Sequence, residues 1–153
     1  MALYYKEDGE QNEQIILFLH GGGVGGWMWD EQVQYFKGKY HCIVPDLPGH
    51  GRSGETDFVS IKDCAFQLIH LLEEKKEDKK IIVVGFSLGA QIAIQMLSQS
   101  LDLIDYAMIN SALVRKVPFG KEMVKPTIKL TYPLIKYRFF SKLQAKQLYI
   151  GPN

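Results

Sequence analysis

The chain has 153 residues, of which 46% are hydrophobic and 23% charged, and its net charge is +1. This composition is typical of one globular domain and argues against a disordered, collagen-like or disulfide-rich protein. The longest apolar run, residues 15–19, is far shorter than the about 20 residues that cross a bilayer, and residues 1–10 lack the apolar core of a signal peptide. Two cysteines without metal-ligand spacing predict no metal site and a cytoplasmic location.

Charge divides the chain near residue 110. Residues 1–110 carry a net charge of −7, whereas residues 111–153 carry +8. A change this abrupt indicates a boundary between two parts of a protein. We therefore expect a core over residues 1–110 and a distinct segment over residues 111–153.

The hydrophobic pattern predicts alternating strands and helices. Short apolar runs bounded by Gly or Pro predict strands buried on both faces, and apolar residues spaced by three and four predict amphipathic helices. This alternation predicts an α/β fold with a mostly parallel sheet and helices on both of its faces. In chain order, we expect an edge strand at 3–5, a strand at 15–19, a helix at 29–36, a strand at 41–44, a helix at 61–72, a strand at 81–84, a helix at 88–97 and a strand at 103–109.

Residues 85–89 (Gly-Phe-Ser-Leu-Gly) lie between a predicted buried strand and a predicted helix. A sharp turn there would strain the backbone of Ser87 and project its hydroxyl at the carboxyl edge of the sheet, where α/β folds place ligands. The N–H of Leu88 at the helix start has no partner within the helix and can face developing negative charge. We predict Ser87 as a nucleophile and Leu88 as an oxyanion donor. The alternative is that Ser87 is an ordinary helix N-cap.

Three consecutive glycines follow the predicted strand 15–19. Glycines allow close backbone approach and leave N–H groups free to bind an oxyanion, so we predict Gly22 N–H as the second donor, with Gly23 as the alternate. A dinucleotide-binding loop is the alternative, since residues 21–26 fit the Gly-x-Gly-x-x-Gly pattern and Asp46 follows 20 residues later. That alternative would make the protein an oxidoreductase.

A third motif, residues 46–53 (Asp-Leu-Pro-Gly-His-Gly-Arg-Ser), stands between the other two. In this order and at these separations, the three motifs resemble the α/β-hydrolase superfamily over about residues 1–112. The resemblance implies a serine nucleophile, an oxyanion hole of two backbone N–H groups and no cofactor. It also implies a small-molecule substrate such as an ester, thioester, amide or related acyl compound.

Three residues near the predicted site are candidate substrate contacts, namely Gly23, Trp27 and Phe86. An aromatic side chain beside a glycine-rich turn suggests an apolar pocket wall, although packing beside the loop is the favoured role of Trp27. The residues of the third motif are favoured as turn formers, with Asp46 binding nearby backbone N–H groups, rather than as catalytic groups.

A serine nucleophile needs a base, and the base needs an orienting acid. In this superfamily both follow the serine, the acid before the histidine. All four histidines of this chain precede Ser87, and none of the later carboxylates (Asp102, Asp105 and Glu122) resembles the family acid. The base and the acid are therefore unknown.

We expect residues 111–153 to begin a helical lid, and the chain to be the N-terminal part of a longer hydrolase or a product truncated within its lid. The alternative is a complete minimal fold. A non-catalytic interaction protein that keeps the fold is the main rival function. The basic, aromatic composition of residues 111–153 can also bind nucleic acid or a membrane surface, but a lid with charges facing water is favoured. We thus expect no nucleic-acid partner, no membrane span, and self-association through an exposed sheet edge.

Overall fold

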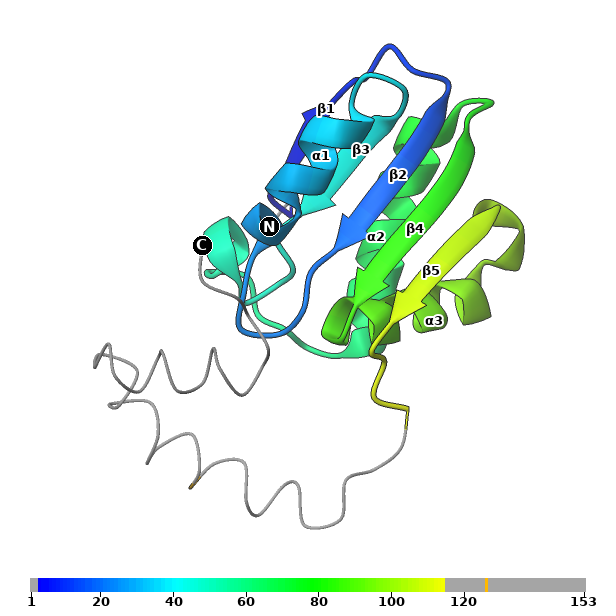
Figure 1. Cartoon of the computed structure of the whole chain (residues 1–153). Helices are drawn as coiled ribbons and strands as arrows, with labels where there is room; N and C mark the ends of the chain where they lie inside the picture. The colour runs from blue at the N-terminus through cyan, green and yellow to red at the C-terminus, as the bar shows by residue number, and fades with distance from the viewer. Residues whose placement is uncertain (1–2, 115–125, 127–153) are drawn as a thin grey trace. The chain divides into compact units, whose positions relative to one another are not determined.

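The computed structural model describes residues 3–114 and Pro126, and the first compact unit of the chain ends at Val114. Its centre is a sheet in the order β1-β3-β2-β4-β5 (Figure 1). Strands β2 to β5 run parallel, and β1 pairs antiparallel with β3. An edge strand is present, but it spans Tyr5–Asp8 and shares only Tyr5 with the predicted range 3–5. The strands are β1 (Tyr5–Asp8), β2 (Gln14–Leu19), β3 (His41–Pro45), β4 (Lys80–Phe86) and β5 (Tyr106–Asn110).

Helices cover both faces of the sheet. Figure 1 shows α1 on one face and α2 with α3 on the other. This arrangement confirms the predicted α/β fold with a mostly parallel sheet. Among the described residues, no helix has the length and apolar character needed to span a membrane. The helices are α1 (Asp30–Phe36), α2 (Ile61–Lys76) and α3 (Leu88–Gln99), with short 3-10 turns at η1 (Gly26–Trp29), η2 (Gly51–Ser53) and η3 (Leu101–Leu103).

Successive side chains of β2 enter two different cores. Leu17 packs with Leu68 of α2 and Ile92 of α3 in the larger core, and all three are fully buried. Phe18 faces the other way and packs with Val33 of α1. Because both faces of the strand are covered, every residue from 15 to 19 is apolar, which explains the uninterrupted run in the sequence.

The fifth strand is shorter than predicted. The apolar pattern predicts a strand over 103–109, but β5 begins only at Tyr106 because Leu101–Leu103 form a 3-10 turn. The Asp105 carboxylate then accepts a hydrogen bond from the Ile81 N–H at 2.8 Å, which fixes where β5 joins β4. Leu103 and Ile104 are nevertheless buried, so the apolar run reports burial correctly and strand geometry incorrectly.

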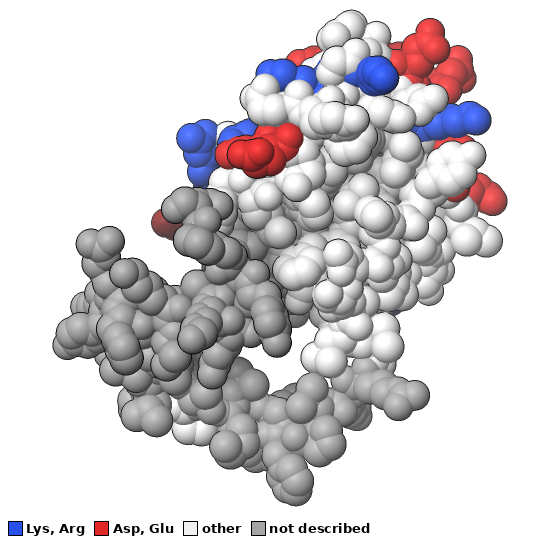
Figure 2. All heavy atoms as spheres, in the orientation of Figure 1, with Lys and Arg blue, Asp and Glu red and all other residues white. Residues whose placement is uncertain are grey.

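Strand β5 is an edge of the sheet within the described residues. It pairs with β4 on one side only, and its side chains are exposed, with Tyr106 at 62% and Met108 at 64%. Figure 2 shows a largely uncharged surface over this part of the molecule, while the charged side chains gather toward the end where the parallel strands begin. An exposed, apolar edge strand can pair with another strand. From residue 115 onward, the predicted lid lies outside the described residues except for Pro126.

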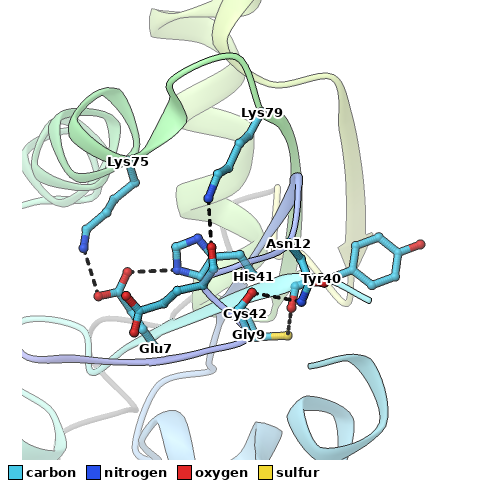
Figure 3. Close-up of polar contacts among 9 residues, drawn as sticks. Glu7, Gly9, Asn12, Tyr40, His41, Cys42, Lys75 and Lys79 are labelled. Carbon is cyan, nitrogen blue, oxygen red and sulfur yellow. Dashed lines mark hydrogen bonds and ion pairs between the residues drawn. The ribbon is translucent and has the colours of Figure 1, made fainter. Parts of the chain in front are cut away.

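A charged cluster joins β1, β3 and α2 at the end of the sheet where the parallel strands begin (Figure 3). One carboxylate oxygen of Glu7 lies 2.9 Å from His41 Nε2, and the other accepts a hydrogen bond from Lys75 Nζ at 2.9 Å. This contact with Glu7 is the main cause that raises the pKa of Lys75 above its usual value. Glu7 thus ties the antiparallel edge strand to the neighbouring strand and to α2.

Replacing Glu7 with alanine is expected to lower the free energy of unfolding by about 2 kcal/mol, because the buried His41 ring and the Lys75 ammonium both lose their partner. Urea denaturation of the variant and the wild type measures the change. Lys6→Ala is the matched control, since Lys6 makes only an exposed ion pair with Asp30 and should change stability by less than about 1 kcal/mol. Equal stability of the two variants would contradict the structural role of Glu7.

Candidate active site

Ser87 occupies a sharp turn between β4 and α3. Strand β4 ends at Phe86 and α3 begins at Leu88, so one residue makes the connection, with φ of 52° and ψ of −108°. The Ser87 N–H donates a hydrogen bond to the Asn110 carbonyl at 2.9 Å, which anchors the turn to the end of β5. The Ser87 hydroxyl makes no capping hydrogen bond to α3, so it does not act as an ordinary N-cap.

The glycine-rich loop (residues 20–26) lies against this turn. A Cβ atom built on Gly21 would stand 3.6 Å from the Ser87 Cβ, and one built on Gly22 would stand 3.8 Å from Leu88 Cδ2. The start of α3 is also bonded to the loop, because the Gly89 N–H donates to the His20 carbonyl at 3.1 Å. Within the described residues, the N–H groups of Gly22 and Leu88 donate no hydrogen bond. The structure therefore brings two free donors and one hydroxyl to the same end of the sheet.

The three candidate substrate contacts differ in how far they are buried and in what they touch. Phe86 is half-buried and lies against the loop, with its Cδ1 3.0 Å from the position of a Gly21 Cβ. Gly23 is exposed and has no heavy atom within 4 Å of a built Cβ. Trp27 is 62% exposed. Its neighbour Trp29 instead packs on Phe18 in the core, with ring centroids 5.2 Å apart.

His20 is fully buried at the end of β2, and both of its ring nitrogens have partners. The Leu47 N–H donates to His20 Nε2 at 2.9 Å, and His20 Nδ1 lies 2.7 Å from the Gly21 carbonyl. Burial is the main cause that lowers the pKa of His20 below its usual value. The ring thus joins the glycine-rich loop to the loop that follows β3, in its neutral form.

Asp46 makes a second connection between the same two loops. Its carboxylate accepts hydrogen bonds from the Gly26 N–H at 2.6 Å and from the Arg52 N–H at 2.8 Å. Asp46 therefore binds backbone N–H groups, as the sequence predicts. A dinucleotide-binding loop is not favoured, because a helix does not open directly after the glycines: a short 3-10 turn intervenes, and α1 begins only at Asp30.

Sequence reasoning missed the role of His20. The available signal was a histidine directly after five buried apolar residues, because a buried polar ring must find hydrogen-bond partners. Which partners it finds depends on the arrangement of two loops far apart in the sequence, and no local pattern encodes that arrangement.

Among the described residues, no side chain hydrogen-bonds the Ser87 hydroxyl. His41 lies at the opposite end of the sheet, at the start of β3, and His70 is an exposed residue of α2. His50 directs Nδ1 to a neighbouring backbone carbonyl at 2.9 Å, and both nitrogens of His20 are occupied. The described part of the structure therefore contains no side chain positioned as the base for Ser87, as the sequence predicts.

Neither cysteine competes with Ser87 as a nucleophile. Both thiols are buried in the core, and burial raises the pKa of Cys42 to about 11 and that of Cys64 to about 12. Because the thiolate is the reactive form, both side chains stay protonated and unreactive near neutral pH.

Replacing Asp46 with alanine is expected to lower the free energy of unfolding by about 2–4 kcal/mol, because two backbone N–H groups lose a charged acceptor. Thermal and urea unfolding of the purified variant measure the loss. Asp57→Ala is the matched control, since Asp57 is an exposed carboxylate and should change stability by less than about 0.5 kcal/mol. A loss no larger than that of the control would show that Asp46 does not hold the two loops together.

The chain is similar to known proteins in sequence and in fold. A model of the alpha/beta hydrolase family matches residues 16–150. The chain is 33% identical over 96 residues to a pimeloyl-[acyl-carrier protein] methyl ester esterase of Vibrio cholerae, which covers 63% of this chain and 35% of that protein. It is 30% identical over 140 residues to the coelenterazine h 2-monooxygenase of Renilla reniformis, covering 86% of this chain and 42% of that protein.

Solved structures give the same fold. A thermophilic esterase from Thermogutta terrifontis superposes with a TM-score of 0.71 at 22% identity, over 84% of this chain and 47% of that one. The chain therefore spans less than half the length of these three relatives. The family match covers most of the chain, and the solved structure shares its fold. The chain belongs to the alpha/beta hydrolase family.

Proposed function

We propose that the protein is a serine hydrolase that acts on an ester, a thioester or a related acyl compound. Ser87 is the nucleophile that attacks the carbonyl carbon, and the N–H groups of Gly22 and Leu88 stabilise the oxygen that becomes negative. The observation that carries this proposal is the positive φ of Ser87 between β4 and α3, beside two N–H groups that donate no hydrogen bond within the described residues. Strain of this kind is concentrated at functional sites.

The oxyanion donors supply the electrostatic part of the reaction. Fixed N–H groups bind the charge that forms in the transition state without having to reorganise, and one such donor is typically worth about 3 kcal/mol. Phe86 lies against Gly21, and Gly23 follows the proposed donor Gly22 in the chain, so we assign both to substrate contact together with the exposed ring of Trp27. The esterases among the relatives support an ester as the first substrate class to test.

The base and its orienting acid lie outside residues 1–153 in this proposal. No histidine follows Ser87 in the sequence, and none of the four that precede it reaches the Ser87 hydroxyl with a hydrogen bond. The chain also spans less than half of its relatives, which leaves ample length in a complete hydrolase for both groups. We keep residues 111–153 as the beginning of a helical lid, and the edge that β5 forms within the described residues as the place where this chain self-associates.

Labelling with a fluorophosphonate probe tests the nucleophile. The probe forms a phosphorus–oxygen bond with a serine hydroxyl and releases fluoride, so intact mass spectrometry and peptide mapping identify the modified residue. We expect the adduct on Ser87, no adduct on the Ser87→Ala variant, and faster labelling when free imidazole supplies the missing base. An unlabelled Ser87 under all of these conditions would refute the hydrolase and favour a non-catalytic protein that keeps the fold.

A further inference from the structure

The glycine-rich loop contains one peptide group whose orientation decides where a proposed oxyanion donor points. The Gly21 carbonyl and the Gly22 N–H belong to the same peptide unit, and in a trans peptide these two groups point in opposite directions. Glycine backbones rotate more freely than any other, so nothing in the loop sequence itself holds this peptide plane. A contact that fixes the Gly21 carbonyl therefore fixes the Gly22 N–H as well.

His20 makes that contact. Its Nδ1 lies 2.7 Å from the Gly21 carbonyl, and the ring is fully buried, so it cannot turn toward solvent. The other nitrogen, Nε2, lies 2.9 Å from the Leu47 N–H. Because a backbone N–H can only donate, Nε2 must accept, and in a neutral imidazole the proton then resides on Nδ1. The carbonyl of Gly21 can only accept, which the protonated Nδ1 satisfies.

The main chain of His20 completes the arrangement. Its carbonyl accepts the hydrogen bond from the Gly89 N–H at 3.1 Å, which holds the first turn of α3 and with it the second proposed donor, Leu88. One residue thus touches both halves of the proposed oxyanion hole, the first through its ring and the second through its carbonyl. Asp46 holds the far end of the glycine-rich loop at Gly26, so the loop is fixed at two points.

We propose that His20 is the positioning residue of the oxyanion hole: its Nδ1–H holds the Gly21 carbonyl and thereby directs the Gly22 N–H toward the reacting carbonyl oxygen. This inference rests on the proposed function of Ser87 and adds the residue that sets the donor in place. His20 does not touch the substrate and takes no proton from Ser87. Protonation of Nε2 would set two donors against each other at Leu47, so the device works only with the neutral ring.

Two substitutions separate the two ring contacts. Asparagine carries its amide nitrogen at the distance of Nδ1 from the backbone, so His20→Asn can restore the bond to Gly21 without the bond to Leu47. Glutamine reaches the position of Nε2, so His20→Gln can restore the bond to Leu47 without the bond to Gly21. His20→Ala restores neither and is the reference for both. Rescue by asparagine but not by glutamine isolates the effect on the Gly21 peptide from general support of the fold.

The rate of Ser87 phosphonylation by the fluorophosphonate probe, in the full chain with imidazole present, is the kinetic readout. We expect His20→Ala and His20→Gln to react about 10- to 100-fold more slowly than the wild type, and His20→Asn to recover most of that loss. Thermal unfolding midpoints recorded on the same samples show whether the asparagine and glutamine variants are equally folded. If the wild-type chain is labelled at Ser87 but the asparagine and glutamine variants react at equal rates, the inference is overturned and the proposed function stands.

An NMR spectrum of the wild-type chain tests the proposed protonation of the His20 ring without any variant or reaction. Long-range proton–nitrogen NMR of histidine-labelled protein distinguishes the two neutral tautomers and the charged ring. We expect His20 to be neutral with the proton on Nδ1 at pH 7.5. A proton on Nε2, or a charged ring, would overturn the inference whether or not Ser87 reacts, so its failure is distinguishable from failure of the proposed function.

Discussion

The 153-residue chain is expected to release one equivalent of product rapidly from an activated aryl ester and then to turn over slowly. Because an activated aryl ester carries a good leaving group, we expect the proposed oxyanion donors to support acylation of Ser87 faster than deacylation, with the serine proton passing to the buffer instead of to the missing base. Hydrolysis of the acyl-enzyme needs a base that activates water, and such a base contributes about 10²- to 10⁴-fold. Stopped-flow detection of the aryl alcohol measures the burst and the later rate, and intact mass detects the acyl group that remains on the chain.

Two variants and one additive define the origin of that burst. Ser87→Ala should abolish it, whereas Ser98→Ala, which changes an exposed serine of α3, should leave it intact. Free imidazole should accelerate the slow phase, because it replaces a base that has a pKa near neutrality. Rapid steady-state turnover that disappears in His50→Ala would contradict the proposal, since the base would then lie within the described residues.

Replacing Gly89 with alanine is expected to destabilise the protein by more than about 3 kcal/mol or to prevent folding. A Cβ atom at this position would overlap the Leu19 carbonyl oxygen and would stand 2.7 Å from the His20 carbonyl oxygen. These are backbone atoms of β2 and of the residue after it, so they cannot move aside as the end of a flexible side chain can. Helix α3 would have to retreat from the sheet, and the hydrogen bond from the Gly89 N–H would be lost.

Gly38→Ala is the matched control for this substitution. No heavy atom lies within 4 Å of a Cβ built on Gly38, so the added methyl group should leave stability unchanged or raise it slightly. Soluble yield, circular dichroism and urea unfolding compare the two variants with the wild type. If Gly89→Ala were as stable as Gly38→Ala, the close packing of α3 on β2 would be wrong, and the turn at Ser87 would lose its structural basis.

The sequence predicts the fold well because burial on two faces leaves a clear pattern. Residues 15–19 are apolar without interruption because β2 lies between two layers of helices. The hydrophobic pattern fails where residues are buried without belonging to a strand: Leu103 and Ile104 are buried but precede β5. Hydrophobicity reports the environment of a side chain, and the hydrogen bonds that define a strand are set by its neighbours.

The candidate site is only partly readable from the sequence. Ser87 and the glycines can be predicted from the sequence, because a sharp turn and a close backbone contact require these residue types. The sequence also predicts that Asp46 binds nearby backbone N–H groups, but not that it reaches Gly26, 20 residues away, nor that His20 accepts a hydrogen bond from Leu47, 27 residues away. A short motif records what one segment must do, whereas the pairing of two loops emerges only from the folded sheet.

The strained backbone of Ser87 sets thermal stability and chemical function against each other. A residue with a side chain at φ of 52° costs the folded state of order 1 kcal/mol or more, and glycine would relieve most of that cost. Ser87→Gly should therefore yield a more heat-resistant protein that has lost its nucleophile. Laboratory evolution of this chain for thermostability alone would select that glycine, and only a parallel selection for activity would retain the hydroxyl.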